Sequence, residues 1–555
     1  MKKSFNIGRR DFIRQTGLGM LAFAGLPSAL KAMEGSSNMR ILPAGKASAN
    51  FIADVEIDLI ACASSVSILP GSPTHVLRYQ AELKKGPANT LTEIPGSYLG
   101  PVMRFQTGQK IRITLINQLN EATIAHWHGL HVPADMDGSP HYAIGKGERF
   151  VYEFEMLNRA SMNIYHPHPH HQTARQFYRG MAGAIIVNDT EEAKLELPAG
   201  EYEIPLVIQD KQFDSENQLV YAPRMHDRMT GYFGDQILVN GKPNQTLNLA
   251  SRAYRFRVLN GSTARIYKLA WDDNSPITVI GTDGGLLEAP VQKPYVMLAP
   301  AERLDLWVDF SGRKLGSQLV LRSRPFSGAL PAMAERMMGG NQGHHGMGMG
   351  GGMGMHHGQT LNNEVSADDT RMGGDYPILT VKISRQVSDS PNLPKTLSHF
   401  KRYTLANVVN PQQAVPLAIS EGPMSMLING RGYADNDVQA FEHIPLNSTQ
   451  LLQIYHVQSG GMGGRMGMMM TMAHPIHLHG QYFQILSRSI ENASADYDSV
   501  KEGFIDTGFK DTVLVMPGET IRIIKPFDDF KGLFMYHCHN LEHEDMGMMR
   551  EFLVE

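Results

Sequence analysis

The chain contains little cysteine, little net charge and no long hydrophobic run. Only two cysteines, Cys62 and Cys538, occur among 555 residues, so the sequence indicates no disulfide framework. A formal net charge of −4 gives no electrostatic reason to expect binding to nucleic acid. Because no apolar stretch is long enough to span a bilayer, we expect no membrane insertion. The length indicates about three or four domains.

Residues 1–32 have the composition of an export signal. Arg9 and Arg10 precede an apolar run at 18–26, and small residues follow up to Ala32. The paired arginines before Phe12 resemble a twin-arginine signal, which exports proteins that are already folded. The alternative is a short N-terminal helix of the mature fold. We favour the signal, and we therefore expect export by the twin-arginine machinery, a periplasmic location and a soluble mature protein.

The stretch 50–195 reads as a first domain made of short strands. Apolar residues occupy every second position at 110–115 and again at 150–156, which is the pattern of half-buried strands. Gly, Pro and Asn lie between these segments, as in an antiparallel sandwich. Two His-x-His pairs occur here, His126 with His128 and His166 with His168. Each pair puts two imidazoles on one face of a strand, the geometry of a shared metal, although paired histidines also occur on solvated edges.

The stretch 200–387 also contains strand-like segments but no His-x-His pair, so we expect a second sandwich without metal ligands. It is interrupted at 333–357 by a segment with seven Met and four His, whose composition cannot build a core. A second run, Met462 to Met472, carries six Met. Thioethers and imidazoles suit Cu(I). The alternative is a disordered loop in which Met is incidental.

The stretch 394–555 contains the same kinds of motif as the first domain. It contains the pair His477 and His479, and its Tyr536-His537-Cys538-His539 echoes the earlier Tyr165-His166-Pro167-His168. An internal repeat of this kind indicates duplicated domains that each donate half of a metal site.

A second kind of site is indicated around Cys538. In a strand, His537 and His539 point one way and Cys538 the other, so one peptide can serve two metal sites. His543 and Met548 follow five and ten residues later and complete a thiolate, imidazole and thioether set that suits a blue-copper centre. His474, three residues before His477, can face away from the His-x-His pair and supply the second imidazole. An incidental cluster in a His-rich chain is the alternative.

These four motifs, in this order, resemble those of the multicopper oxidase family, in particular its Met-rich bacterial branch of cuprous oxidases and laccase-like enzymes. The resemblance covers essentially the whole mature chain. It implies an all-β fold of three consecutive cupredoxin-like Greek-key β-sandwich domains at 50–195, 200–387 and 394–555. It also implies four copper ions, one of type 1, one of type 2 and two of type 3.

The resemblance implies a role for each matching residue. The type 1 copper would be held by His474, Cys538, His543 and Met548. The type 2 copper would be held by His126 and His477. The type 3 pair would be held by His128, His166, His168, His479, His537 and His539. Two carboxylates, Asp137 and Glu544, match the positions that deliver protons in this family.

The implied activity is one-electron oxidation of Cu(I) or of phenolic and other aromatic donors, coupled to reduction of dioxygen to water, by a monomer that serves copper tolerance. The segment 433–435 departs from the cuprous oxidases because it lacks their Met near the type 1 site. The alternatives are a general laccase, a copper-sequestering resistance protein, a scaffold that has lost its copper and a copper nitrite reductase. Sequestration would need only the Met and His runs, a lost site would require broken motifs, and a nitrite reductase would not need four His-x-His pairs.

Overall fold

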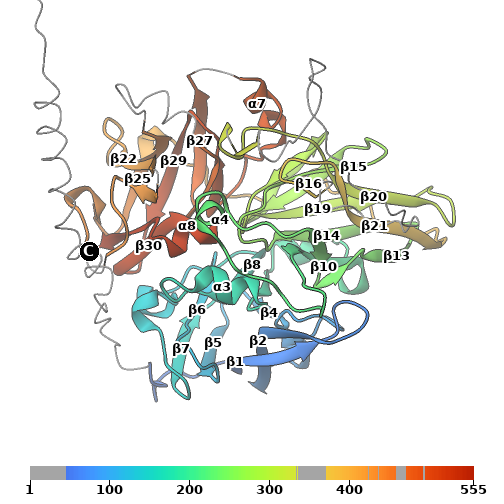
Figure 1. Cartoon of the computed structure of the whole chain (residues 1–555), viewed down its shortest axis with the longest axis horizontal. Coiled ribbons are helices and arrows are strands. Elements are labelled where there is room, and N and C mark those ends of the chain that lie inside the picture. Colours follow the sequence, from blue (N-terminus) through green and yellow to red (C-terminus); the bar gives the residue numbers. More distant parts are fainter. Residues whose placement is uncertain are drawn as a thin grey trace, which may run out of the picture. The chain divides into compact units, whose positions relative to one another are not determined.

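The computed structural model describes residues 45–332, 334–335, 370–422, 424–434, 437–457, 471–491 and 494–555. The expected export signal at 1–32 lies outside these residues, as do nearly all of the insertion at 333–357 and the Met run up to Met470. Strands make up most of the regular structure of the described residues (Figure 1). The all-β fold class predicted from the sequence is confirmed.

The first set of strands forms two sheets. One has the order β2 (Thr74–Lys85), β1 (Val55–Val66), β5 (Lys110–Asn117), β7 (Arg149–Glu155). The other has the order β3 (Leu91–Thr92), β4 (Val102–Gln106), β9 (Gly183–Asn188), β8 (Ser161–Pro167), β6 (Ala125–His128). The alternating Ile111, Ile113 and Leu115 of β5 are fully buried, and they share one core with Phe105 and Ile185 of the other sheet. The alternation therefore produces a sandwich, because each sheet buries one face against its partner.

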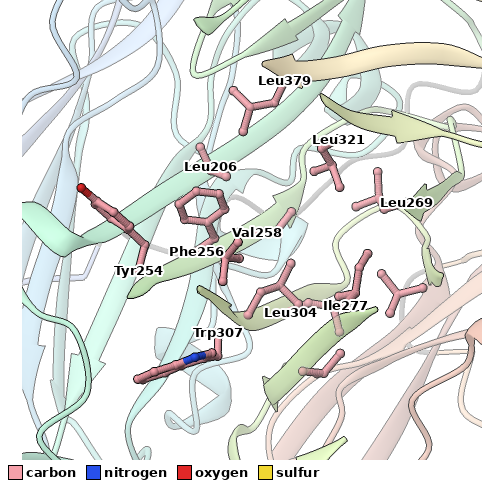
Figure 2. Close-up of a cluster of buried hydrophobic side chains, with 14 of the residues drawn as sticks. Leu206, Tyr254, Phe256, Val258, Leu269, Ile277, Leu304, Trp307, Leu321 and Leu379 are labelled. Atoms are coloured by element: carbon pink, nitrogen blue, oxygen red, sulfur yellow. The ribbon is translucent and has the colours of Figure 1, made fainter. Parts of the chain in front are cut away.

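The second set also forms two sheets. One has the order β12 (Lys242–Pro243), β11 (Gln236–Val239), β10 (Glu203–Lys211), β14 (Ala253–Asn260), β19 (Arg303–Asp309), β16 (Ile277–Thr282), β17 (Gly285–Lys293). The other has the order β13 (Thr246–Ala250), β21 (Tyr376–Arg385), β20 (Gln318–Ser323), β15 (Tyr267–Trp271), β18 (Val296–Leu298). Figure 2 shows the core between them, where Phe256 and Val258 of β14 lie near Leu269 and Leu321 of the opposite sheet.

The third set repeats this arrangement. One sheet has the order β23 (Ser425–Ile428), β22 (Val415–Gly422), β25 (Ser448–His456), β29 (Glu519–Phe527), β27 (Gln484–Ile490). The other has the order β24 (His443–Ile444), β31 (Met549–Val554), β30 (Gly532–Cys538), β26 (His474–Leu478), β28 (Thr512–Val515). Each of the six sheets draws its described strands from a single one of the three sets.

Short helices join the strands. The α-helices are α3 (Thr173–Tyr178), α4 (Met225–Thr230), α7 (Ala495–Asp498) and α8 (Leu541–Asp545). The 3-10 turns are η1 (Ala88–Thr90), η2 (Ala134–Met136), η3 (Pro140–Tyr142), η4 (Glu192–Lys194), η5 (Gly200–Tyr202), η6 (Leu405–Asn407), η7 (Ala440–Glu442) and η8 (Lys501–Gly503). Helix α8 contacts both α3 and α4, so segments that follow strands of all three sets meet there (Figure 1).

Within the described part of the chain, no helix is both long and apolar enough to cross a bilayer. Cys62 is a free thiol on β1 with only 7% of its surface exposed.

Candidate metal centre

The first candidate site lies around Cys538, at the end of β30. His474 Nδ1 lies 3.4 Å from Cys538 Sγ, and His543 Nδ1 lies 3.6 Å from the same sulfur. Helix α8 begins three residues after the strand ends and so returns His543 to the thiol. Met548 is fully buried in the same core, and its carbonyl accepts a hydrogen bond of 3.1 Å from the Cys538 amide. The structure therefore brings together the thiolate and imidazole atoms predicted from the sequence and places Met548 beside them.

Burial sets the protonation of this site. It raises the pKa of the Cys538 thiol well above its ordinary value and lowers the pKa values of His474 and His543. Without a metal, the site therefore holds a neutral thiol and two neutral imidazoles at pH 7. A soft metal that binds the thiolate has to displace the thiol proton, whereas the imidazoles are already in their ligating form.

The second candidate site lies between the first and third sets of strands. On the first side, β6 and β8 pair in a register that puts His126 directly opposite His166. On the third side, β26 and β30 pair in a register that puts His477 opposite His537. Because alternate side chains share a face, these two ladders each present several imidazoles toward the same space.

Eight imidazoles meet in that space. His479 Nε2 and His168 Nε2 lie 3.1 and 3.4 Å from His537 Nε2, and these three side chains have ligand atoms close enough to share one ion. The His128 ring stacks on His477 at 3.6 Å, and the His126 ring stacks on His479 at 3.9 Å. The remaining rings, His166 and His539, have centroids 5.3 Å apart. The cluster is assembled from both sets of strands, as the internal repeat predicted.

The ring nitrogens have the arrangement that a metal requires. His126, His166 and His477 each have Nδ1 within 2.9 Å of a backbone carbonyl, which leaves Nε2 pointing into the cluster without a partner. Within the described part of the chain, His539 has no hydrogen-bond partner on either nitrogen. Buried polar atoms are nearly always hydrogen-bonded, so several unpartnered nitrogens in one space mark groups that a metal would satisfy. The residues present therefore fit a metal cluster.

Burial also favours the neutral form of seven of these imidazoles, those of His128, His166, His168, His477, His479, His537 and His539, by lowering their pKa values. Together with the neighbouring imidazoles, it lowers the pKa of His168 to about 3 and that of His537 to about 3. It lowers the pKa of His477 to about 4. Neutral imidazole is the form that binds metal, so His168, His477 and His537 keep their lone pairs available well below neutral pH.

Comparison with known proteins decides the family. Residues 75–192 and 417–555 match multicopper oxidase domains. A multicopper oxidase of Staphylococcus haemolyticus is 30% identical over 459 residues, which are 83% of each chain. The chain belongs to the multicopper oxidase family.

Two further similarities extend this result. A laccase of Bacillus stratosphericus is 28% identical over 84% of this chain and 90% of its own. The crystal structure of a variant of the McoA multicopper oxidase of Aquifex aeolicus superposes with a TM-score of 0.71 at 30% identity, over 91% of this chain and 97% of that one. This multicopper oxidase is thus a copper-dependent oxidoreductase that uses dioxygen and reducing substrates, with the cupredoxin-like fold predicted from its motifs.

The two predicted carboxylates both lie at the histidine cluster. Asp137 Oδ2 accepts a hydrogen bond of 2.7 Å from His479 Nδ1. Glu544 Oε2 lies 3.2 Å from His537 Nδ1, and its Oε1 lies 3.6 Å from His168 Nδ1. Burial raises the pKa of the Glu544 carboxyl. Both side chains therefore lie where a proton could pass to the cluster, and their role in delivering it remains a prediction.

The histidines next to the first-domain pair differ from one another. His171 is exposed, and its Nδ1 lies 2.7 Å from the carbonyl of Asp545. His170 is half-buried between the rings of His171 and Tyr433. Neither belongs to the groups that could hold a metal among the described residues.

Three functional candidates were missed by the sequence reasoning. Glu421 Oε1 lies 3.2 Å from His474 Nε2 and 3.2 Å from His456 Nδ1. Asp511 Oδ1 lies 3.0 Å from His128 Nε2. Glu421, His456 and Asp511 have no sequence motif around them, and their partners are tens to hundreds of positions away. Only the paired strands of the fold reveal them.

Proposed function

We propose that this multicopper oxidase binds four copper ions and oxidises Cu(I) and phenolic donors in the periplasm, in the service of copper tolerance. The observation that carries the proposal is the position of Cys538. Its sulfur faces His474 and His543, while its sequence neighbours His537 and His539 face the histidine cluster. The backbone on either side of Cys538 thus joins a thiolate site to a cluster of imidazoles.

The ligand atoms divide naturally among four ions. His474, Cys538, His543 and Met548 would hold the type 1 ion. His126 and His477 would hold the type 2 ion. His168, His479 and His537 would hold one type 3 ion, and His128, His166 and His539 the other. Each proposed type 3 trio combines histidines of the first and third sets of strands, so neither set could form the cluster alone.

When bound, copper would supply the one-electron oxidation of donors and the four-electron reduction of dioxygen to water. The protein supplies the surroundings. It excludes bulk water from the cluster, since His128, His166 and His537 have no exposed surface. It holds protons close to the reacting oxygen, because the buried carboxyl of Glu544 retains its proton to a higher pH than an exposed glutamate. It fixes ring orientation through the carbonyl and carboxylate partners of the imidazoles.

Spectroscopy of copper-loaded variants tests the assignment. The wild-type protein should be blue because a thiolate and two imidazoles surround one ion. Cys538→Ser should abolish the blue band, whereas His128→Ala should keep it and lose oxygen uptake. A blue band that persists in Cys538→Ser would refute the type 1 assignment.

The preference for Cu(I) is supported by the surroundings of His474. Glu421 bridges His474 and His456, and the backbone amide of Met472 donates to the same carboxylate oxygen at 3.3 Å. The Met run at 462–472 begins six residues after His456 and ends at Met472. His456, before the run, and Met472, its last residue, therefore both contact the carboxylate beside His474. Soft thioethers in this part of the sequence would favour Cu(I) over a large organic donor.

Oxygen uptake with Cu(I) and with a phenol, compared side by side, tests this preference. Deleting 333–357 should reduce Cu(I) oxidation at limiting copper and leave phenol oxidation equal or greater. A deletion that leaves Cu(I) turnover unchanged would favour a general laccase instead.

Export can be tested independently of activity. Replacing both Arg9 and Arg10 by Lys should keep the protein in the cytoplasm if the twin-arginine route is used. Cell fractionation followed by immunoblotting measures this. Periplasmic accumulation of the doubly substituted protein would contradict the proposed route.

A further inference from the structure

A buried ion pair joins the second set of strands to the histidine cluster. Arg303, the first residue of β19, donates two hydrogen bonds to Asp511, one of 2.7 Å from Nη1 to Oδ1 and one of 2.5 Å from Nη2 to Oδ2. Neither side chain has more than 1% of its surface exposed. The geometry is the two-pronged form that holds a carboxylate in one orientation.

The same aspartate contacts two of the proposed copper ligands. Its Oδ1 lies 3.0 Å from His128 Nε2, and its backbone carbonyl lies 2.9 Å from His477 Nδ1. Thr512 Oγ1 donates to Asp511 Oδ1 at 2.9 Å and lies 3.1 Å from His128 Nε2. Both oxygens of the Asp511 carboxylate therefore have hydrogen-bond partners, which are a guanidinium, a hydroxyl and an imidazole.

This contact decides which nitrogen of His128 can bind a metal. A carboxylate accepts hydrogen bonds, so the proton of the neutral imidazole resides on Nε2 and the lone pair on Nδ1. His128 Nδ1 is buried without a partner, whereas in His126 and His477 the unpartnered nitrogen is Nε2. His128 is thus turned the other way round from these neighbours, and Asp511 is the group that turns it.

Arg303 is itself fixed by all three sets of strands. Its backbone amide donates to Asp283 Oδ1 at 2.8 Å, and its Nε donates to the carbonyl of Met162 in β8 at 2.9 Å. Lys510, next to Asp511, pairs with Asp283 at 3.1 Å. The guanidinium therefore has little freedom, and its position is transmitted to Asp511 and from there to His128.

We propose that the Arg303–Asp511 pair is a positioning device that fixes the Nδ1-binding form of His128 and the orientation of His477, so that the domain without copper ligands controls the cluster. The proposal rests on the copper assignment of these two histidines given above. Groups that orient metal-ligating histidines typically change metal affinity by about 10- to 100-fold when they are replaced. Asp511→Asn keeps the shape of the side chain but removes the charge and one acceptor oxygen.

The experiment compares copper-loaded Asp511→Asn and Arg303→Lys with the wild-type protein and with Asp305→Asn. Asp305 is a matched control because it lies on the same strand as Arg303 and also forms a buried ion pair. Its Oδ2 accepts a hydrogen bond of 2.5 Å from Arg255 Nη2. No hydrogen bond joins Asp305 to a histidine among the described residues. Copper content, the blue band, the type 2 electron paramagnetic resonance spectrum and the thermal midpoint are measured for each protein.

Asp511→Asn should keep the blue band but bind copper at the cluster about 10- to 100-fold more weakly, with altered type 2 resonance parameters. Arg303→Lys keeps the charge and should show a smaller change of the same kind. Asp305→Asn should lower the thermal midpoint and leave the resonance parameters unchanged.

Type 2 parameters and copper affinity that are unchanged in both Asp511→Asn and Arg303→Lys would overturn the proposal, even with a lowered thermal midpoint, since the pair would then only stabilise the fold. If Asp511→Asn does not accumulate, Arg303→Lys decides the question by the same readouts. A wild-type protein that lacks both the blue band and a type 2 signal would instead refute the proposed copper assignment, which distinguishes that failure from failure of the positioning role.

Discussion

The neutral state of the Cys538 site predicts how many protons leave when a metal enters it. Burial holds the thiol in its protonated form and holds the imidazoles of His474 and His543 in their neutral form. Binding of one equivalent of Cu(I) to the apoprotein should therefore release one proton, from the thiol alone. The affinity should rise about tenfold for each pH unit, which is about 1.4 kcal/mol, and by about 4 kcal/mol between pH 6 and pH 9.

The direction of the pH dependence of Cu(I) affinity follows from which state of the site binds the proton. The metal-free site carries the thiol proton and the metal-bound site does not, so raising the pH favours binding. An ordinary thiol with a pKa of about 8.5 would lose most of its proton by pH 9.5, and the pH dependence would flatten there. Two ordinary imidazoles with a pKa of about 6.5 would add nearly two further protons at pH 5.5. The buried site should keep its thiol proton at pH 9.5, and it should add fewer than two protons at pH 5.5 because burial lowers both imidazole pKa values.

Titration calorimetry of the apoprotein in two buffers of different ionisation enthalpy counts the protons directly. The matched control is Cys538→Ala, for which the first equivalent of Cu(I) should release none, because neutral imidazoles and thioethers have no proton to lose. Release of clearly more than one proton at pH 7, or an affinity that stops rising above pH 9, would refute the reasoning from burial.

Three further predictions concern the cluster and its support. Asp137→Asn and Glu544→Gln should slow oxygen reduction while leaving single-turnover reduction of the blue centre by donor nearly unchanged; loss of the donor step alone would contradict the proposed proton role. Gly138 has φ +82°, and a Cβ there would lie 2.0 Å from the carbonyl of Ala125, so Gly138→Ala should cost more than 2 kcal/mol of stability and displace the β6 histidines. Gly147→Ala, at φ +80° with open space around it, should cost only about 1 kcal/mol in a thermal melt and keep full activity. Copper removal should lower the thermal midpoint, since ions at 1,000 times their dissociation constants contribute about 4 kcal/mol per site, and equal melting of the apo and copper-loaded proteins would exclude this linkage.

The candidate ligand residues could be proposed from the sequence because their geometry is local. Two positions apart on a strand means the same face, so His126 with His128 and His537 with His539 are readable as pairs without a structure. The resemblance of the motifs to those of the multicopper oxidase family also implied the fold class. The pairing of β6 with β8 then adds what spacing alone cannot give, which is that His126 lies opposite His166.

The groups around the ligands could not be predicted, because their partners are distant in the chain. Arg303 and Asp511 meet across 208 positions, and Glu421 reaches His474 across 53. No repeating spacing in the sequence links such residues, and each one by itself resembles an ordinary charged surface residue. Burial of an ion pair is a property of the assembled domains, and so is the choice between Nδ1 and Nε2 at His128.

The second domain illustrates why a ligand count understates what a domain contributes. It supplies none of the proposed copper ligands, yet Arg303 on β19 and Asp283 lie in the buried network that ends at His128 and His477. A buried charge is tolerated only when its partners are held in place, so this network requires all three sets of strands to be docked together. Loosening the second domain would free Asp511 from its guanidinium, and His128 would then lose the group that keeps its Nδ1 directed at the cluster. We therefore expect copper binding to be coupled to the packing of the second set of strands against the other two, even though that set supplies none of the proposed ligands.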